Sequence, residues 1–123
     1  MDVTPLVPKD RQVIESYGAG SFRVSGVMHQ GAVMVLPLAT YPWFAASMTE
    51  ISLDNLAPVI EAKVEILLLG CGPKMIRLPQ AIRQSLRDHG IVADVMDTGA
   101  ACRTYNILLA EDRRVAAALL PVG

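Results

Sequence analysis

The most constraining stretch of the sequence is VEILLLGCGPKMIR, residues 64–77. It starts as a short apolar run and enters a loop bracketed by Gly70 and Gly72. Shortly after it, Pro79 suits the first turn of a helix, because its missing N–H would have no partner there in any case. A buried strand that leads through a glycine-containing loop into a helix is typical of an α/β protein.

The residues that follow this loop predict a helix over 79–89. Leu78, Ile82 and Leu86 recur at a helical spacing and form one apolar face. Gly90 fits the position just after the helix, where a left-handed backbone is common. We therefore expect an amphipathic helix that packs its apolar face on the preceding strand.

The rest of the second half repeats this alternation. An apolar run at 91–96 precedes Asp97 and Thr98, either of which can cap a helix that extends to about residue 110. We expect strands 64–69 and 91–96 to be parallel neighbours, while the direction of the last strand stays open. The expected order is strand 64–69, helix 79–89, strand 91–96, helix 98–110 and strand 115–120.

The first half of the chain predicts β-structure. The segment HQG, which ends at Gly31, predicts a hairpin between the second and third strands. The AVMVL run has no polar alternation, so we place it in mid-sheet with both faces covered. A short helix capped by Asp54 is expected over 54–60. The three expected strands lie at 13–17, 22–28 and 32–36.

Size and composition narrow the class of protein. A chain of 123 residues favours a single domain over 1–123, with residues 1–11 as a loose lead-in. The net charge of −1 gives no sign of nucleic-acid binding. Apolar residues make up 52%, so either the sheet is buried on both faces or apolar surface is kept for a partner. We see no signal-peptide pattern and no apolar run long enough to span a membrane, which indicates a cytoplasmic protein.

The G-C-G of the loop invites comparison with dinucleotide-binding proteins. Their fingerprint needs a third glycine or alanine three residues after the second, where this chain has Met75. The Lys-Ser/Thr pair of a phosphate-binding P-loop is also missing. Two cysteines alone do not make a metal framework. We therefore expect no cofactor, no metal and no catalytic residue, and interpret the glycines as a tight turn.

Polar and thiol groups follow the two expected parallel strands. Because both strands end at the same edge of the sheet, the loops after them share one rim, where ligands of open α/β sheets bind. A thiol near a helix N-terminus and basic groups can have a lowered pKa, and the alternative is an inert, buried cysteine. The candidate rim site consists of Cys71, Lys74, Asp97, Thr98, Cys102 and Arg103.

No charged residue occurs over 24–49. The connection after the AVMVL strand must nevertheless reach the surface, because connections run over the outside of a domain. It carries Tyr41, Trp43 and Phe44, and aromatic residues often supply binding energy at interfaces. We predict that they form a docking patch, anchored by Trp43, for a partner protein or a second copy of the chain. The alternative is that Trp43 closes the end of the core.

Two long segments, LLLGCGPKMIRLP and DVMDTGAACRTYNILLAEDRRVAAALLPVG, resemble domain of unknown function family 498. The SGV…GAVMVLP stretch and the TYPW segment also fit this family, and TGAACRTYN is the most specific part. One member of the family is a mitochondrial respiratory complex I assembly factor. The resemblance implies a single three-layer α/β domain with a mixed sheet, and it transfers no catalytic residues.

This resemblance favours protein binding and assembly over catalysis. We expect a non-enzymatic, bacterial, cytoplasmic factor that binds a protein partner and serves respiratory or other membrane complexes. The lack of a complete catalytic constellation points the same way. The alternative is binding of a small anionic ligand, or thiol chemistry, at the candidate rim site.

Overall fold

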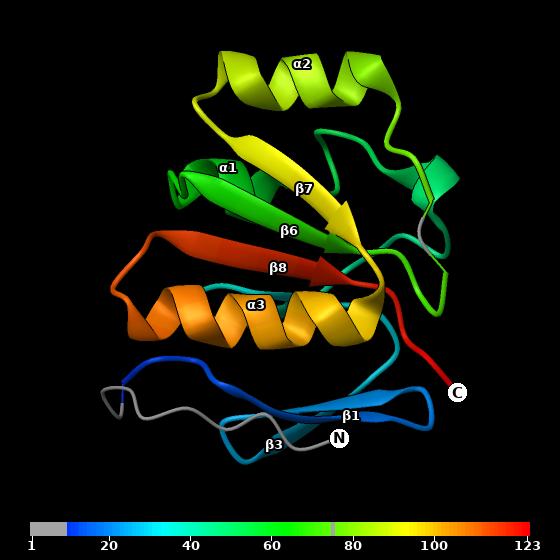
Figure 1. The fold of residues 1–123 in the computed structure, drawn as a ribbon, viewed down its shortest axis with the longest axis vertical. Helices are drawn as coiled ribbons and strands as arrows, with labels where there is room; N and C mark the ends of the chain where they lie inside the picture. The colour runs from blue at the N-terminus through cyan, green and yellow to red at the C-terminus, as the bar shows by residue number, and fades with distance from the viewer. Residues whose placement is uncertain (1–9, 75) are drawn as a thin grey trace.

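The computed structural model describes residues 10–74 and 76–123 (Figure 1). Most of the expected lead-in at 1–11 therefore lies outside the described residues, as does Met75. None of the helices among the described residues is long and apolar enough to cross a membrane.

A five-stranded mixed sheet forms the centre of the fold. Its strands are β4 (Val33–Val35), β5 (Thr40–Pro42), β6 (Ile66–Gly70), β7 (Val92–Met96) and β8 (Val115–Leu119). Their order across the sheet is β5-β4-β8-β6-β7. β6 is parallel to β7, which confirms the predicted neighbours, and β6 is also parallel to β8. β4 is antiparallel to both β5 and β8 and is buried throughout, so the AVMVL run does lie in mid-sheet.

A smaller antiparallel sheet holds β1 (Ile14–Gly18), β2 (Ser21–Val24) and β3 (Val27–Gln30). The predicted hairpin at Gly31 is wrong, because the turn lies earlier, at Ser25 and Gly26. Both turn residues have positive φ, 45° and 84°, as a two-residue type I′ turn requires. Gly31 instead lies where the chain passes from one sheet to the other.

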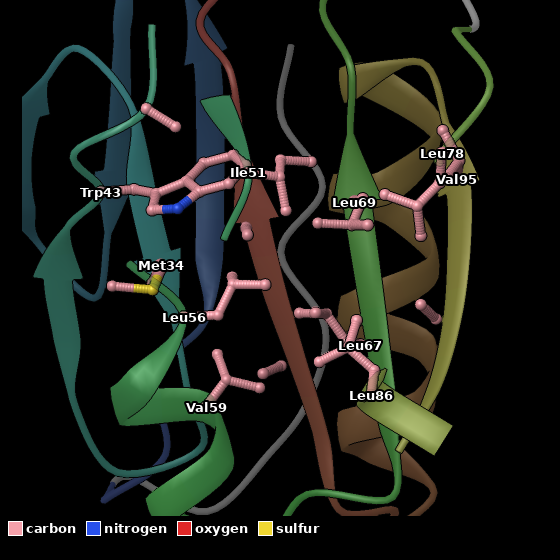
Figure 2. Packing of buried hydrophobic residues seen from close by; sticks show 14 of the residues in the cluster. Met34, Trp43, Ile51, Leu56, Val59, Leu67, Leu69, Leu78, Leu86 and Val95 are labelled. Atoms are coloured by element: carbon pink, nitrogen blue, oxygen red, sulfur yellow. The ribbon is translucent and has the colours of Figure 1, made fainter. Parts of the chain in front are cut away.

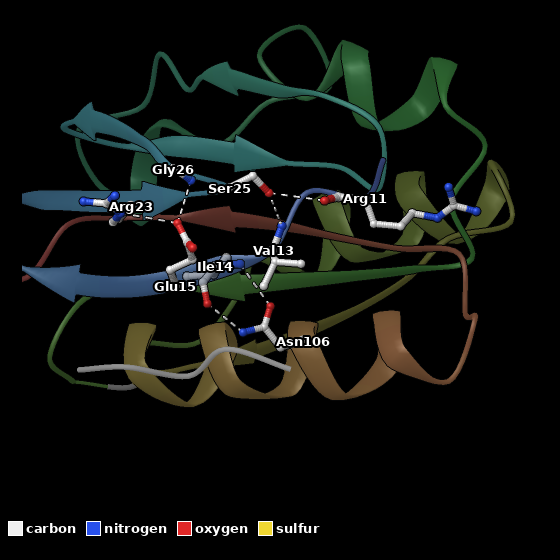
Figure 3. Close-up of polar contacts among 8 residues, drawn as sticks. All are labelled: Arg11, Val13, Ile14, Glu15, Arg23, Ser25, Gly26 and Asn106. Carbon is white, nitrogen blue, oxygen red and sulfur yellow. Dashed lines mark hydrogen bonds and ion pairs between the residues drawn. The ribbon is translucent and has the colours of Figure 1, made fainter. Parts of the chain in front are cut away.

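Polar contacts hold the small sheet in place (Figure 3). Glu15 Oε1 accepts a hydrogen bond from Gly26 N at 2.6 Å, and so fixes the turn. The buried Asn106 donates to Ile14 O at 2.7 Å and accepts from Ile14 N at 3.1 Å. This amide pairs both backbone groups of a residue 92 positions away, which joins β1 to the helix that carries Asn106.

The two long helices match the sequence prediction. They are α2 (Gln80–Asp88), which starts after Pro79, and α3 (Thr98–Ala110). Asp97 caps α3, since its Oδ1 accepts from Ala100 N at 2.9 Å. The helix expected at 54–60 is shorter and begins later, and Asp54 does not cap it. It is α1 (Ala57–Glu61), which follows the 3-10 turn η1 (Met48–Glu50) and has Pro58 in its first turn, where proline is tolerated.

The elements form three layers, as the family resemblance implies. One face of the five-stranded sheet packs against α1, α2 and the 43–56 segment. The opposite face packs against α3 and the small sheet, which lie side by side (Figure 1). Every residue of β8 is fully buried between these layers.

Candidate functional site

The loops after β6 and β7 meet at one edge of the sheet, as the parallel arrangement predicts. Cys71 N donates to Met96 O at 3.0 Å, and Thr98 N donates to Gly72 O at 2.9 Å. Of the six rim candidates, Cys71, Asp97 and Thr98 therefore lie close together. Their detailed contacts show what this edge of the sheet can do.

Thr98 is a fully buried connector. Its Oγ1 accepts from Gly72 N at 2.9 Å and donates to Leu120 O at 2.7 Å. A Cβ on Gly70 would lie 3.1 Å from both Cα and Oγ1 of Thr98, so glycine allows this close approach. Both roles of the hydroxyl are filled within the protein, which makes Thr98 a structural residue of the rim rather than a ligand-binding one.

Cys71 is also engaged with the backbone. Its Sγ lies 2.9 Å from Lys74 O and 3.1 Å from Met96 O, and it accepts from Ile76 N at 3.2 Å. The side chain is buried, whereas Lys74 is exposed. The thiol thus supports the turn of the loop, and Lys74 extends into solvent from it.

Cys102 does not face the rim. It is fully buried between α3 and the sheet, and burial raises the pKa of its thiol to about 12. This shift is opposite to the lowered pKa that a reactive cysteine needs, because desolvation outweighs the nearby Arg103. Cys102 is therefore a packing residue, as the alternative in the sequence analysis states.

Arg103 points toward the small sheet. Its Nη1 donates to the hydroxyl of Tyr17 at 3.2 Å. Gly99 leaves room for this tyrosine, since a Cβ there would lie 2.5 Å from the hydroxyl oxygen. Neighbouring residues on a helix project about 100° apart, so Arg103 and Cys102 have different surroundings. The rim candidates do not form one pocket, and the described residues contain no group of three His, Cys, Asp or Glu side chains that could hold a metal ion.

The outer side of β5 presents apolar surface. Among the described residues this strand pairs only with β4 and so forms an edge of the sheet. Tyr41 is 42% exposed and Phe44 is 80% exposed, which places two of the three predicted patch residues at the surface. Leu38, in the preceding turn, is 67% exposed. We call Leu38, Tyr41 and Phe44 the β5 edge surface.

Trp43 is not part of this surface, which corrects the prediction that it anchors an exposed patch. Only 4% of its surface is exposed, and it packs in the same core cluster as Met34 and Leu56 (Figure 2). Its indole N–H donates to Asn55 Oδ1 at 3.3 Å, which satisfies the polar end of the ring. Trp43 therefore closes the end of the core, and the chain exposes Phe44 immediately after it.

A pocket of about 230 Å³ opens beside the β5 edge surface. Leu38 and Tyr41 line it, together with Val64, which lies two residues before β6. Leu38 and this pocket were not among the features predicted from the sequence. The signal was the Leu-Pro-Leu-Ala sequence at 36–39, which forms a tight turn with Pro37 in its second position and Leu36 N bonded to Ala39 O at 2.8 Å.

Comparison with known proteins gives consistent relatives. Residues 14–120 match the family described as "Protein of unknown function (DUF498/DUF598)". The chain is 38% identical to an uncharacterized protein of Rhodobacter capsulatus over 89% of this chain and 84% of that one. It is also 38% identical to NADH dehydrogenase [ubiquinone] 1 alpha subcomplex assembly factor 3 of Danio rerio, over 89% of this chain but only 64% of the longer relative.

Solved structures agree with this relationship. The crystal structure of an outer membrane protein from Bartonella henselae superposes with a TM-score of 0.84 at 38% identity. The superposition covers 94% of this chain and 98% of that one, so the similarity extends over the whole fold. The protein is thus a member of the DUF498/DUF598 family.

Proposed function

We propose that this protein is a non-enzymatic assembly or interaction factor that binds subunits of a respiratory or other membrane complex. The observation that carries the proposal is the β5 edge surface. Eight large apolar side chains are exposed among the described residues, and three of them, Leu38, Tyr41 and Phe44, lie within seven positions of one another. Leu38 and Tyr41 also line the same pocket, and exposed apolar surface on small proteins commonly marks contact sites for other proteins.

The names of the sequence relatives support the same function. Relatives of similar sequence are named assembly factors of the NADH dehydrogenase [ubiquinone] 1 alpha subcomplex. Because the chain spans 64% of the zebrafish factor and 60% of the human one, it corresponds to the larger part of those proteins. The role in assembly, and a respiratory complex as its target, are transferred to this chain as proposals.

The proposal also places the protein in the cytoplasm. Both cysteines are free and buried, which fits a reducing compartment. Thiol chemistry, the alternative function at the rim, has no support from the surroundings of Cys71 and Cys102, since one supports a loop and the other stays protonated.

Deletion of the gene in its own host tests the proposal. We expect the deletion strain to lose assembled NADH dehydrogenase on native gels and the wild-type gene to restore it. The double variant Tyr41→Ser/Phe44→Ser should fail to restore assembly while its protein remains folded. Val92→Ser/Ile107→Ser is the matched control, because these two apolar residues are also exposed, at 56% and 58%, but lie away from β5.

Two results would contradict the proposal. Normal assembly of membrane complexes in the deletion strain would rule out the proposed assembly function. Full restoration by Tyr41→Ser/Phe44→Ser would show that the β5 edge surface is not the contact site. If a second copy of the chain occupied this surface instead, the purified protein would form a dimer, which sedimentation would detect.

A further inference from the structure

A row of arginines marks α2 and the loop before it. Arg83 and Arg87 lie one helical turn apart, and Gln80 and Gln84 project from the same side of the helix. Arg77 and Arg83 line one open pocket of about 430 Å³. We call Arg77, Arg83 and Arg87 the arginine row.

No ion pair to the arginine row forms within the part of the chain that the structure describes. Among the described residues, the ion pairs within 4.0 Å use other arginines, namely Arg11, Arg23 and Arg113. No acidic residue occurs in the sequence between Glu65 and Asp88. The guanidinium of Arg83 makes one hydrogen bond to a described residue, from its Nη1 to Ala93 O on the outer side of β7 at 2.7 Å. The positive charge of the row is therefore available to another molecule.

We infer that the arginine row binds an acidic segment of a partner protein, an inference that rests on the proposed function as an assembly factor. Charge complementarity carries it, because guanidinium groups form paired hydrogen bonds with carboxylates. Spacing of about one helical turn between Arg83 and Arg87 suits a short segment with several carboxylates. The surface lies across the sheet from β5, so it is separate from the β5 edge surface (Figure 1).

The surroundings of the row favour a protein segment over a membrane. A helix that binds a lipid surface must insert its apolar face between the headgroups. The apolar face of α2 is occupied, since Leu86 is fully buried in the core and Ile82 packs against it.

Nucleic acid is disfavoured by the small extent of the row. Asp88 follows Arg87 directly and is exposed. The basic surface is therefore limited to three arginines with a carboxylate at its end, whereas a long polyanion needs a broad basic surface.

Fluorescence polarisation with a fluorescein-labelled deca-glutamate peptide tests the inference. The variant Arg77→Gln/Arg87→Gln should weaken peptide binding about tenfold at low salt, since each exposed ion pair contributes at most modestly. Arg83 is kept because of its bond to Ala93. The matched control, Arg23→Gln/Arg113→Gln, removes the same charge elsewhere and should change affinity less than about twofold.

Equal weakening by the two variants would overturn the inference, because only net charge would then matter. Tighter binding of phosphatidylglycerol vesicles or of a single-stranded DNA decamer through the same arginines would also overturn it. In the assembly assay, full restoration by Arg77→Gln/Arg87→Gln would reject the arginine row and leave the proposed function intact. If the wild-type gene itself has no effect on assembly, the proposed function fails, and the peptide titration still decides whether the row binds acidic segments.

Discussion

The two edges of the five-stranded sheet differ in the side chains that border them. Exposed leucine, tyrosine and phenylalanine side chains border β5. At the other edge, β7 lies beside α2, and Arg83 of this helix donates a hydrogen bond to the outer backbone of the strand. The edges are protected from unwanted strand pairing in different ways. β5 has three residues and ends at Pro42, which has no N–H to offer. β7 has five residues and no proline, and the guanidinium of Arg83 occupies its carbonyl at Ala93.

This difference suggests a division of work between the two edges. Apolar contact supplies affinity that depends little on salt, whereas charged contact gives orientation and depends strongly on salt. An assembly factor that binds subunits of a larger complex benefits from an apolar surface and a charged surface on separate sides. Substitutions at each edge test whether the two edges differ in this way.

Trp43→Ala should have the largest effect. It removes a buried indole and leaves a cavity, so the free energy of unfolding should fall by about 3–5 kcal/mol in urea denaturation. Phe44→Ala is the matched control, and it should change stability by less than about 0.5 kcal/mol because the ring is exposed. Similar losses for both would mean that β5 has no free apolar surface, and the comparison of the edges would collapse.

Arg83→Met should have an intermediate effect. The substitution keeps an apolar chain in place of the arginine stem but removes the donor to Ala93 O, and it should cost about 1 kcal/mol of unfolding free energy. Arg87→Met, one turn later, has no such bond among the described contacts and should be nearly neutral. Thermal unfolding of the two variants at low salt measures the difference. Identical melting temperatures would show that the guanidinium does not protect β7.

The smallest effects are expected from the surface variants themselves. Tyr41→Ser/Phe44→Ser and Arg77→Gln/Arg87→Gln should each alter the unfolding free energy by less than about 0.5 kcal/mol per substitution. Urea denaturation curves with unchanged midpoints and slopes would establish that any loss of binding comes from the surface. A large loss of stability in either variant would assign those side chains to folding instead.

The second half of the fold could be predicted because its signals are local. Pro79, Asp97 and Gly90 mark helix ends, and the apolar spacing of Leu78, Ile82 and Leu86 sets the inner face of α2. The turn at Ser25 and Gly26 also has a local signal, the Ser-Gly pair, but the prediction from the sequence places the turn at Gly31 instead. Ser25 takes positive φ without being glycine, and the turn interrupts a run that is otherwise rich in strand-forming residues.

The candidate sites were harder to predict because side-chain direction depends on contacts made far along the chain. Parallel strands brought Cys71 and Thr98 together, as expected from topology alone. The orientation of α3 about its own axis places Cys102 toward the sheet. The side-chain amide of Asn55 accepts a hydrogen bond from Trp43 and helps to hold the indole in the core. The contact between Trp43 and Asn55 joins residues 12 positions apart and has no counterpart in local spacing. Cys102, by contrast, lies three and seven positions before the buried Tyr105 and Leu109, a helical spacing that did indicate an inward face.

The position of β8 has a consequence for biosynthesis. This strand joins the two halves of the five-stranded sheet, yet it is translated after both of them. While the ribosome is still making β8, β4 and β6 each present an unpaired apolar edge, the kind that pairs readily with other chains. The nascent polypeptide therefore carries two partial sheets that only a late insertion can join. Slower translation just before β8 would prolong that vulnerable interval.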